Sequence, residues 1–362
     1  MKVLLLGEFS SLHRYLKEGL LELGVDVKLY ANGDSWKKIS GADGPLFPQD
    51  GGNALKRYYS YYVKAFDTAK NFKGYDVVQT VSARIYPMLI NNRLLNKIAK
   101  QNDCFSLASA GDDLALYDAY KNGKFEYYLF DYDKEALSQF DPSTFKGKMR
   151  RKTDKKIVKL SDVIVPSLYD YSVGYRGEER LSKVIPFPIN TDAIEYKENK
   201  LSEKVVFFHG LNRELSKGTP IIRAALERLK NDYPNDVEVI IDGHMPFDRY
   251  VEVMNRSNVV IDQCCTYAYG INACIAMAQG KVVMAGNRAE TREAFGIESS
   301  PIVHIQPNED QIYDQLVKIL ESKKDIPEIG YRSRKYVEDV HHYVKNAQKY
   351  VDVWSRAGEN KK

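Results

Sequence analysis

Short apolar runs rich in β-branched residues alternate with longer amphipathic stretches along the sequence, and this alternation restricts the folds that the chain can adopt. Between the runs, apolar residues recur at helical spacing, as at Leu12, Leu16 and Leu20. Such a pattern predicts parallel sheets whose two faces are both covered by helices. The predicted strands are residues 3–6, 25–30, 77–80, 105–108, 163–166, 183–185, 205–209, 237–241, 259–262, 282–285 and 302–305.

A linker divides these predicted strands into two series. Residues 186–201 contain two prolines followed by a polar stretch, a composition typical of a connection between domains. We therefore predict an N-terminal α/β domain over residues 1–188 and a C-terminal α/β domain over residues 189–331. A last helix, predicted at about residues 332–356, is expected to pack back on the first domain.

Composition and simple motifs exclude several classes of protein. A net charge of +4, from 53 Lys and Arg against 49 Asp and Glu, argues against nucleic-acid binding over the whole surface. The first βα turn, Gly7 to Ser11, lacks the G-x-G-x-x-G pattern of dinucleotide oxidoreductases. The four cysteines form no C-x-x-C pair, so the expectation is a reduced, cytoplasmic protein.

The segment 207–220 carries the strongest signal for a binding site. A predicted strand ends near Gly210, and a short loop then presents Arg213 and Lys217 before a helix that Pro220 can open. Helix N-termini and loop amides attract anions, and the two side chains add full positive charges. We predict a diphosphate site here with both cations exposed in a cleft. The alternative is two surface cations in an ordinary loop.

This loop resembles the G-R-x-x-x-K-G segment of retaining GT-B glycosyltransferases of the glycogen-synthase and mannosyltransferase-like group (glycosyl transferases group 1), in which the Arg and Lys bind the donor diphosphate. Arg213, Lys217 and Gly218 stand at the matching positions. Further segments resemble motifs of the family in the same order, and the resemblance covers residues 160–310. They are residues 160–167 ("A-D-x-I-x-x-x-S"), 184–190 ("V-I-P-N-G-V-D"), 239–243 (a strand ending "G-x-G"), 257–261 ("A-D-V-x-V"), 269–272 ("F-G-L") and 276–283 ("A-M-A-x-G-x-P-V").

The resemblance implies a GT-B fold, in which two Rossmann-like parallel-sheet domains face a cleft and the C-terminal domain binds the donor. It implies anomeric retention without a metal or other cofactor, with Arg213, Lys217 and amides near Gly270 neutralising the leaving diphosphate. The donor-binding residues that it implies are Gly210, Arg213, Lys217, Gly218, Asp242, Gly243, Tyr267, Tyr269, Gly270, Ile271 and Asn272.

Two carboxylates of the family pattern are absent. The family places one Glu two residues before its "F-G" turn, where it faces the donor sugar, and a second Glu eight residues later, where it binds the ribose. This sequence has Tyr267 and Ile275 at those positions. Asn272, one helical turn before Ile275, and the Tyr267 hydroxyl are candidate substitutes. A divergent active enzyme and an inactive homologue that kept the fold both remain open.

In the first half of the chain, residues 105–113 end a predicted strand with two adjacent carboxylates. The segment resembles the family's "H-G-x-D", with Ala110 in place of the His, Asp113 at the family's Asp and Asp112 as the alternative. Either carboxylate could orient or deprotonate an acceptor hydroxyl. The competing interpretation is that Asp113 caps the helix that follows.

Two basic stretches, residues 56–64 and 146–159, suit an anionic membrane surface or a lipid-phosphate acceptor, and the second holds eight Lys and Arg with one acid. Solvated helix faces are the competing interpretation. The sequence thus predicts a glycosyltransferase that moves a sugar from a nucleotide-sugar donor to a glycan, lipid-linked or other hydroxyl acceptor. It would be cytoplasmic, with peripheral contact at the inner face of a membrane. The alternatives are a non-catalytic glycosyltransferase-like subunit and a GT-B sugar-nucleotide epimerase or hydrolase.

Overall fold

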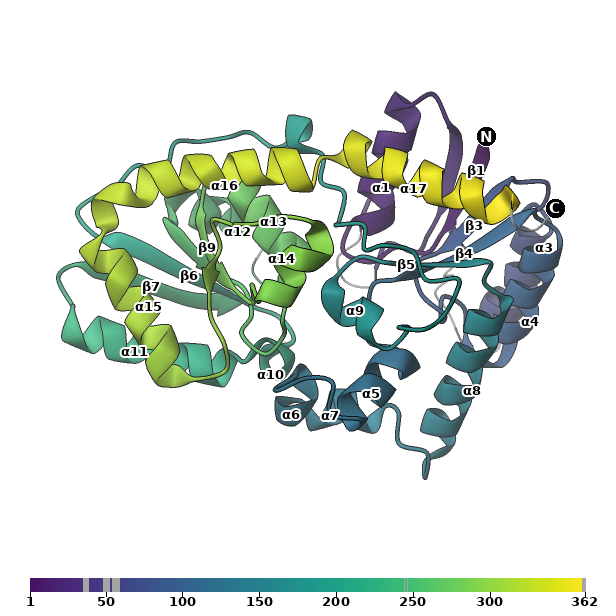
Figure 1. Ribbon diagram of the computed structural model, residues 1–362, viewed down its shortest axis with the longest axis horizontal. Helices are drawn as coiled ribbons and strands as arrows, with labels where there is room; N and C mark the ends of the chain where they lie inside the picture. The colour runs from purple at the N-terminus through teal and green to yellow at the C-terminus, as the bar shows by residue number, and fades with distance from the viewer. Residues whose placement is uncertain (35–38, 48–52, 54–58, 244, 246, 360–362) are drawn as a thin grey trace. The chain divides into compact units, whose positions relative to one another are not determined.

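The computed structural model describes residues 1–34, 39–47, 53, 59–243, 245 and 247–359, so residues 56–58 of the first basic stretch lie outside the described residues. The chain forms two compact units (Figure 1). Unit 1 comprises Met1–Asn122, Ser138–Asn190 and Tyr343–Lys362, and unit 2 comprises Gly123–Leu137 and Thr191–His342.

The sheet of unit 1 has five parallel strands in the order β2-β1-β3-β4-β5. They are β1 (Lys2–Leu6), β2 (Asp26–Tyr30), β3 (Val77–Thr80), β4 (Cys104–Ser109) and β5 (Val163–Pro166). Successive side chains of β1 enter different apolar clusters: Leu4 and Leu6 lie in one, Val3 and Leu5 in the other. Because both faces are buried, β1 is a continuous apolar run rather than an alternating one.

Helices cover both faces of this sheet (Figure 1). The apolar sides of α1 (Leu12–Glu22) and α17 (Tyr343–Glu359) supply Leu16, Leu20 and Trp354 to the cluster around Val3. The other cluster is covered by α3 (Ala65–Ala69), α4 (Met88–Lys100) and α8 (Phe145–Leu160). The remaining helical segments are the π-helix Tyr59–Lys64, α5 (Leu114–Lys121) and α9 (Tyr169–Val173).

The sheet of unit 2 is also parallel, in the order β10-β9-β8-β6-β7. Its strands are β6 (Val205–Leu211), β7 (Val237–Gly243), β8 (Val259–Ile261), β9 (Val282–Ala285) and β10 (Val303–His304). Figure 1 shows α11 and α15 on one face and α13 and α16 on the other. Two parallel sheets covered by helices confirm the predicted α/β fold class.

The helical segments of unit 2 follow the strands in βα order, with three short ones before the first strand. They are α6 (Leu129–Tyr132), α7 (Lys134–Ser138, which ends in unit 1), the 3-10 turn Thr191–Ala193, α10 (Glu214–Lys217), α11 (Thr219–Asp232), α12 (Phe247–Arg256), α13 (Ile271–Ala278), α14 (Ala289–Phe295), α15 (Glu309–Glu321), the 3-10 turn Lys323–Asp325 and α16 (Ile326–Val340).

The strand predicted at residues 183–185 is wrong. Leu181 forms only an isolated bridge with Ile164, and the Ile185 amide donates one hydrogen bond to the end of β5. Pro186 follows and has no amide hydrogen, so a ladder cannot continue through it. Ile185 is nevertheless buried in the core, which accounts for the apolar run in the sequence.

The single helix predicted at about residues 332–356 is wrong, because α16 and α17 are separate helices in different units. His341, between them, is fully buried, with its Nε2 2.9 Å from the Tyr269 hydroxyl. Two residues later, the Tyr343 amide donates to the Ile189 carbonyl at 3.2 Å. Residues 123–137 were included in the predicted first domain but belong to unit 2, and the main structural boundary follows Asn190.

A glycine in α1 allows α17 to approach closely, and its replacement should destabilise unit 1. A Cβ on Gly19 would lie 2.4 Å from the Tyr343 carbonyl oxygen and 2.9 Å from the Ala347 Cβ. Gly19→Ala should therefore cost about 1–3 kcal/mol in urea unfolding. Gly358→Ala, in open space near the end of α17, should instead be neutral or stabilise by up to about 1 kcal/mol. Equal effects of the two substitutions would contradict this packing.

Candidate functional site

The strand orders locate the edge of each sheet where a ligand is expected. Parallel α/β sheets bind ligands beyond the carboxyl ends of their strands, where the strand order reverses. In unit 2 this point lies between β6 and β8, so the loops 212–218 and 262–270 flank it. In unit 1 it lies between β1 and β3. The loop that the sequence predicted as the diphosphate site thus reaches the switch point of unit 2.

The backbone of this loop has two residues in the left-handed region. Arg213 has a φ of 46°, immediately before the short helix α10, and Gly218 has a φ of 78°, immediately before α11. A Cβ on Gly218 would lie 2.3 Å from the Cys264 Sγ and 2.7 Å from the Cys265 Sγ. The position therefore requires glycine, because the loops after β6 and β8 pack directly on each other.

Lys217 is not exposed as predicted. It retains only 9% of its accessible surface, and its Nζ lies 2.9 Å from Oδ1 of Asp262, which is itself 3% exposed. The second oxygen of Asp262 accepts a hydrogen bond from the Gly270 amide at 3.0 Å. Burial opposes ionisation of this carboxyl, but the charge and hydrogen bond of Lys217 hold the pKa of Asp262 below its usual value.

Sequence analysis missed Asp262 because it placed the residue at the end of a strand. An acidic residue directly after a buried parallel strand is, however, a recognisable signal, since that position is where the strand meets the ligand edge. The side chain lies between the two groups, Lys217 and the Gly270 amide, that the resemblance assigned to the diphosphate.

Arg213, the other predicted cation, is exposed. One of its guanidinium nitrogens lies 3.5 Å from the Ser216 hydroxyl, which donates a hydrogen bond to the carboxylate of Asp133. Asp133 belongs to the segment Gly123–Leu137, so this segment reaches the loop after β6.

The segment Gly123–Leu137 also contacts Tyr267, which lies in the loop after β8. The Tyr267 hydroxyl accepts a hydrogen bond from the Glu126 amide at 2.7 Å, and its ring meets Phe125 edge-on at 5.4 Å. Arg288 lies 4.4 Å above the ring and pairs with the Glu126 carboxylate at 2.7 Å. Tyr267 is 3% exposed. The Tyr267 hydroxyl thus holds the segment Gly123–Leu137 through Glu126. In the family pattern, the position of Tyr267 has a carboxylate.

The side chain of Tyr269, one of the predicted donor-binding residues, lies inside the protein. It is fully buried, and its hydroxyl lies 2.6 Å from the Tyr336 hydroxyl and 2.9 Å from Nε2 of His341. The side chain of Ile271, the first residue of α13, is also buried, whereas Asn272 next to it is exposed.

The structure brings the other predicted donor residues to the same edge of the sheet. Gly210 and Asp242 are register partners at the ends of β6 and β7, and the exposed Asp242 carboxylate accepts a hydrogen bond from the Gly243 amide at 2.7 Å. A Cβ on Gly243 would lie 2.3 Å from the Leu211 carbonyl oxygen, so the two strand ends are closely apposed. The donor-binding role of these residues stays a prediction.

In unit 1, Asp113 caps α5 as the competing interpretation proposed. Its carboxylate accepts hydrogen bonds from the Leu116 amide at 2.8 Å and from the Tyr175 hydroxyl at 2.6 Å, and burial raises its pKa to about 6. Asp112, the alternative, is partly exposed, and its backbone carbonyl accepts a hydrogen bond from Arg84 at 2.7 Å. Both residues are partly exposed, and the acceptor role of either carboxylate stays a prediction.

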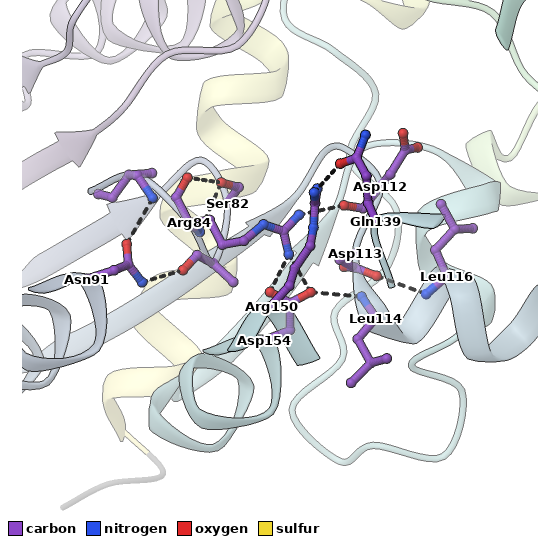
Figure 2. Close-up of polar contacts among 12 residues, drawn as sticks. Ser82, Arg84, Asn91, Asp112, Asp113, Leu114, Leu116, Gln139, Arg150 and Asp154 are labelled. Atoms are coloured by element: carbon purple, nitrogen blue, oxygen red, sulfur yellow. Dashed lines mark hydrogen bonds and ion pairs between the residues drawn. The ribbon is translucent and has the colours of Figure 1, made fainter. Parts of the chain in front are cut away.

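Two arginines that sequence analysis did not identify lie beside the turn at Asp112 and Asp113 (Figure 2). Arg84, from the loop after β3, pairs with the buried Asp154, which also accepts from the Leu114 amide at 2.9 Å. Arg150 lies 4.7 Å from the Phe140 ring centre. Burial and the neighbouring Arg84 charge lower the pKa of the Arg150 guanidinium to about 10. The edge of unit 1 thus combines carboxylates with two guanidinium groups.

The loop after β1 carries an internal carboxylate at a helix N-terminus. Glu8 accepts hydrogen bonds from the amides of Phe9 at 2.7 Å and Arg14 at 2.8 Å, and burial raises its pKa to about 7. His13 is fully buried, with its Nδ1 2.8 Å from the Gly7 carbonyl. Glu8 therefore satisfies the amides of α1 that would otherwise be available to an anion.

Comparisons with known proteins identify the fold. No protein family and no curated protein matches the sequence. Solved structures match over nearly the whole chain. Sucrose-phosphate synthase from Thermosynechococcus elongatus is 14% identical, with a TM-score of 0.63 over 98% of this chain and 99% of that one. HepE from Anabaena, in complex with UDP and glucose, is 12% identical, with a TM-score of 0.62 over 98% and 100%.

A third structure of this fold is an epimerase. UDP-GlcNAc 2-epimerase from Neisseria meningitidis, bound to UDP-GlcNAc, is 13% identical, with a TM-score of 0.54 over 98% of this chain and 100% of that one. The three similarities establish that the chain has the GT-B-type α/β fold predicted from its sequence. No helix within the described ranges is long and apolar enough to cross a bilayer.

A buried histidine beside the predicted donor loop should make unit 2 sensitive to acid. His209 Nδ1 donates to the Ile261 carbonyl at 2.9 Å, and Nε2 lies 2.8 Å from the Thr219 hydroxyl. Burial lowers the pKa of His209 to about 4, below the roughly 6.5 of an unfolded chain. The unfolded state therefore binds more protons between these values, and stability falls as the pH falls.

The free energy of unfolding of unit 2 should decrease by about 3 kcal/mol from this residue between pH 6.5 and 4. His209→Gln should be less stable at pH 7.5 by about 1–3 kcal/mol, because two hydrogen bonds are disturbed, but it should lose less stability on acidification. Urea titrations at several pH values measure both quantities. A variant that is as acid-sensitive as the wild type would show that His209 does not carry the effect.

Proposed function

We propose that this chain binds a nucleoside-diphosphate sugar at the carboxyl edge of the unit 2 sheet and transfers the sugar to a hydroxyl acceptor. The observation that carries the proposal is the placement of the exposed Arg213 and the buried Lys217 on the loop after β6, at the switch point of a parallel sheet. The similar structures that hold UDP, UDP with glucose, or UDP-GlcNAc support a nucleotide-sugar ligand.

The chemistry follows from the charge that develops on the leaving group. Cleavage of the bond between sugar and diphosphate leaves negative charge on the diphosphate, which Arg213 can meet with two parallel hydrogen bonds. Stabilisation of that charge is the main catalytic contribution expected of such a site. We propose retention of configuration without a dedicated nucleophile, and Asp112 as the group in unit 1 that orients the acceptor hydroxyl.

Removal of the Arg213 guanidinium should weaken diphosphate binding. Each charge-assisted hydrogen bond contributes roughly 1.5–3 kcal/mol, so Arg213→Ala should lower the affinity about ten- to a hundredfold. Calorimetric titration with UDP, GDP and ADP measures this effect. The control is Arg228→Ala, on α11, which removes an exposed cation that pairs with Asp310. Wild-type affinity in the Arg213 variant would refute the donor-site assignment.

An epimerase or hydrolase that acts on the nucleotide sugar is the second candidate. The whole-chain similarity to UDP-GlcNAc 2-epimerase and the replacement of both family carboxylates, by Tyr267 and Ile275, favour it. Incubation with UDP-GlcNAc and other nucleotide sugars separates the candidates. A transferase releases the nucleoside diphosphate faster when an acceptor is added, whereas an epimerase changes the sugar without such release. A non-catalytic subunit binds but does neither.

We further propose that α8 contacts an anionic membrane surface. A groove of about 540 Å³ along this helix is lined mainly by cationic side chains, and Phe145 at the start of the helix is 68% exposed. The lining residues are Pro142, Lys148, Arg151, Lys152, Lys155, Lys156 and Lys159. A cationic strip beside an exposed aromatic ring suits a surface of anionic headgroups.

Liposome co-sedimentation tests this contact. Binding to vesicles of phosphatidylcholine with 30% phosphatidylserine (about a third anionic, chosen to give a strong surface charge) should fall steeply as salt rises. At about 1 kcal/mol per charge, replacing Lys152, Lys155 and Lys159 by Gln should weaken binding about a hundredfold. The matched control replaces three exposed lysines of unit 2, Lys230, Lys318 and Lys324. Binding that is absent or independent of salt would leave the solvated-face interpretation.

A further inference from the structure

The predicted diphosphate subsite already contains an anion that belongs to the chain. The Asp262 carboxylate accepts from Lys217 Nζ with one oxygen, at 2.9 Å, and from the Gly270 amide with the other, at 3.0 Å. Gly270 is the N-cap of α13, so its amide lies at the positive end of that helix. An ammonium group and a helix-terminal amide are also the donors that a phosphate oxygen would seek.

The Lys217–Asp262 ion pair is buried rather than exposed at the surface. Asp262 is 3% exposed and Lys217 is 9% exposed, so neither charge is solvated as a free side chain would be. The loops that carry them are also held together by the contact of Gly218 with Cys264 and Cys265. The buried Lys217 ammonium is therefore already engaged by Asp262, and a phosphate that binds there would compete with this carboxylate.

We propose that Asp262 is an internal competitor of the donor diphosphate and thereby the residue that sets donor affinity. The inference rests on the proposed function, since it assigns the diphosphate to Lys217 and the Gly270 amide. When the diphosphate binds there, it takes over both hydrogen bonds from the Asp262 carboxylate. The competing account makes Asp262 a positioning residue that holds Lys217 ready for the phosphate.

The charge of the Lys217–Asp262 pair separates the two accounts. The pair is neutral in the wild type, and Asp262→Asn leaves the positive charge of Lys217 while keeping an oxygen that can accept from the Gly270 amide. As a competitor, Asp262 should thus be inhibitory, and Asp262→Asn should bind UDP, GDP or ADP about tenfold more tightly. As a positioning residue, it should be helpful, and the same variant should bind less tightly.

A second variant keeps the test decisive if Asp262→Asn is too unstable to purify, because the unpaired Lys217 is buried. Lys217→Met combined with Asp262→Asn restores a neutral pair. If Asp262 already cancels the attraction of Lys217 for phosphate, this double variant should bind within about threefold of the wild type. If Asp262 instead positions Lys217 for the phosphate, the double variant loses a ligand that Asp262 did not oppose, and it should bind about ten- to a hundredfold less tightly.

Calorimetric titration of the wild type and these variants with UDP, GDP and ADP measures the affinities, and thermal unfolding in parallel shows that each variant is folded. Tighter binding by Asp262→Asn, together with near wild-type binding by the double variant, supports the proposal. Unchanged or weaker binding by Asp262→Asn, in a wild type that binds, overturns the proposal alone. No binding by any folded variant overturns the proposed function as well.

Discussion

The burial of both faces of each parallel sheet is the constraint on which the rest of the structure depends. Strands such as β1 and β8 have no polar face, because helices cover both sides, and their backbone polar groups are paired within the sheet. Polar side chains that could do chemistry are therefore concentrated where strands end and helices begin. This is why Arg213 and Asp262 in unit 2, and Asp112 and Arg84 in unit 1, all follow the carboxyl ends of strands.

At these edges, carboxylates of the chain itself pair with amide groups that could otherwise bind an anion. Asp262 accepts a hydrogen bond from the Gly270 amide before α13. Glu8 and Asp113 likewise accept hydrogen bonds from backbone amides at the starts of α1 and α5. A helix N-terminus that is already capped by a carboxylate attracts a phosphate less strongly, because the two anions compete for the same donors. Under our proposal, donor recognition at such an edge depends on how readily the internal carboxylate gives way. Arg213 is the predicted cation that remains exposed.

The central strands were predictable because burial of both faces makes each of them an apolar run in the sequence. The loop after β6 was predictable because strand, cations and helix are contiguous in the sequence. Contacts between residues that are far apart in the sequence could not be predicted in this way. Lys217 was expected to be exposed, but its partner Asp262 lies on the next loop of the switch point. Tyr269 was assigned to the site by its neighbour Gly270, whereas its hydroxyl is held by Tyr336 and His341, which lie far along the chain.

A crystal structure of the chain with UDP tests the central claim, that the carboxyl edge of the unit 2 sheet is the donor site, most directly. The account predicts that the two phosphates lie between the loops after β6 and β8, with the Arg213 guanidinium within hydrogen-bonding distance. Phosphates bound at the edge of the unit 1 sheet, or at any position that leaves Arg213 without contact, would contradict it.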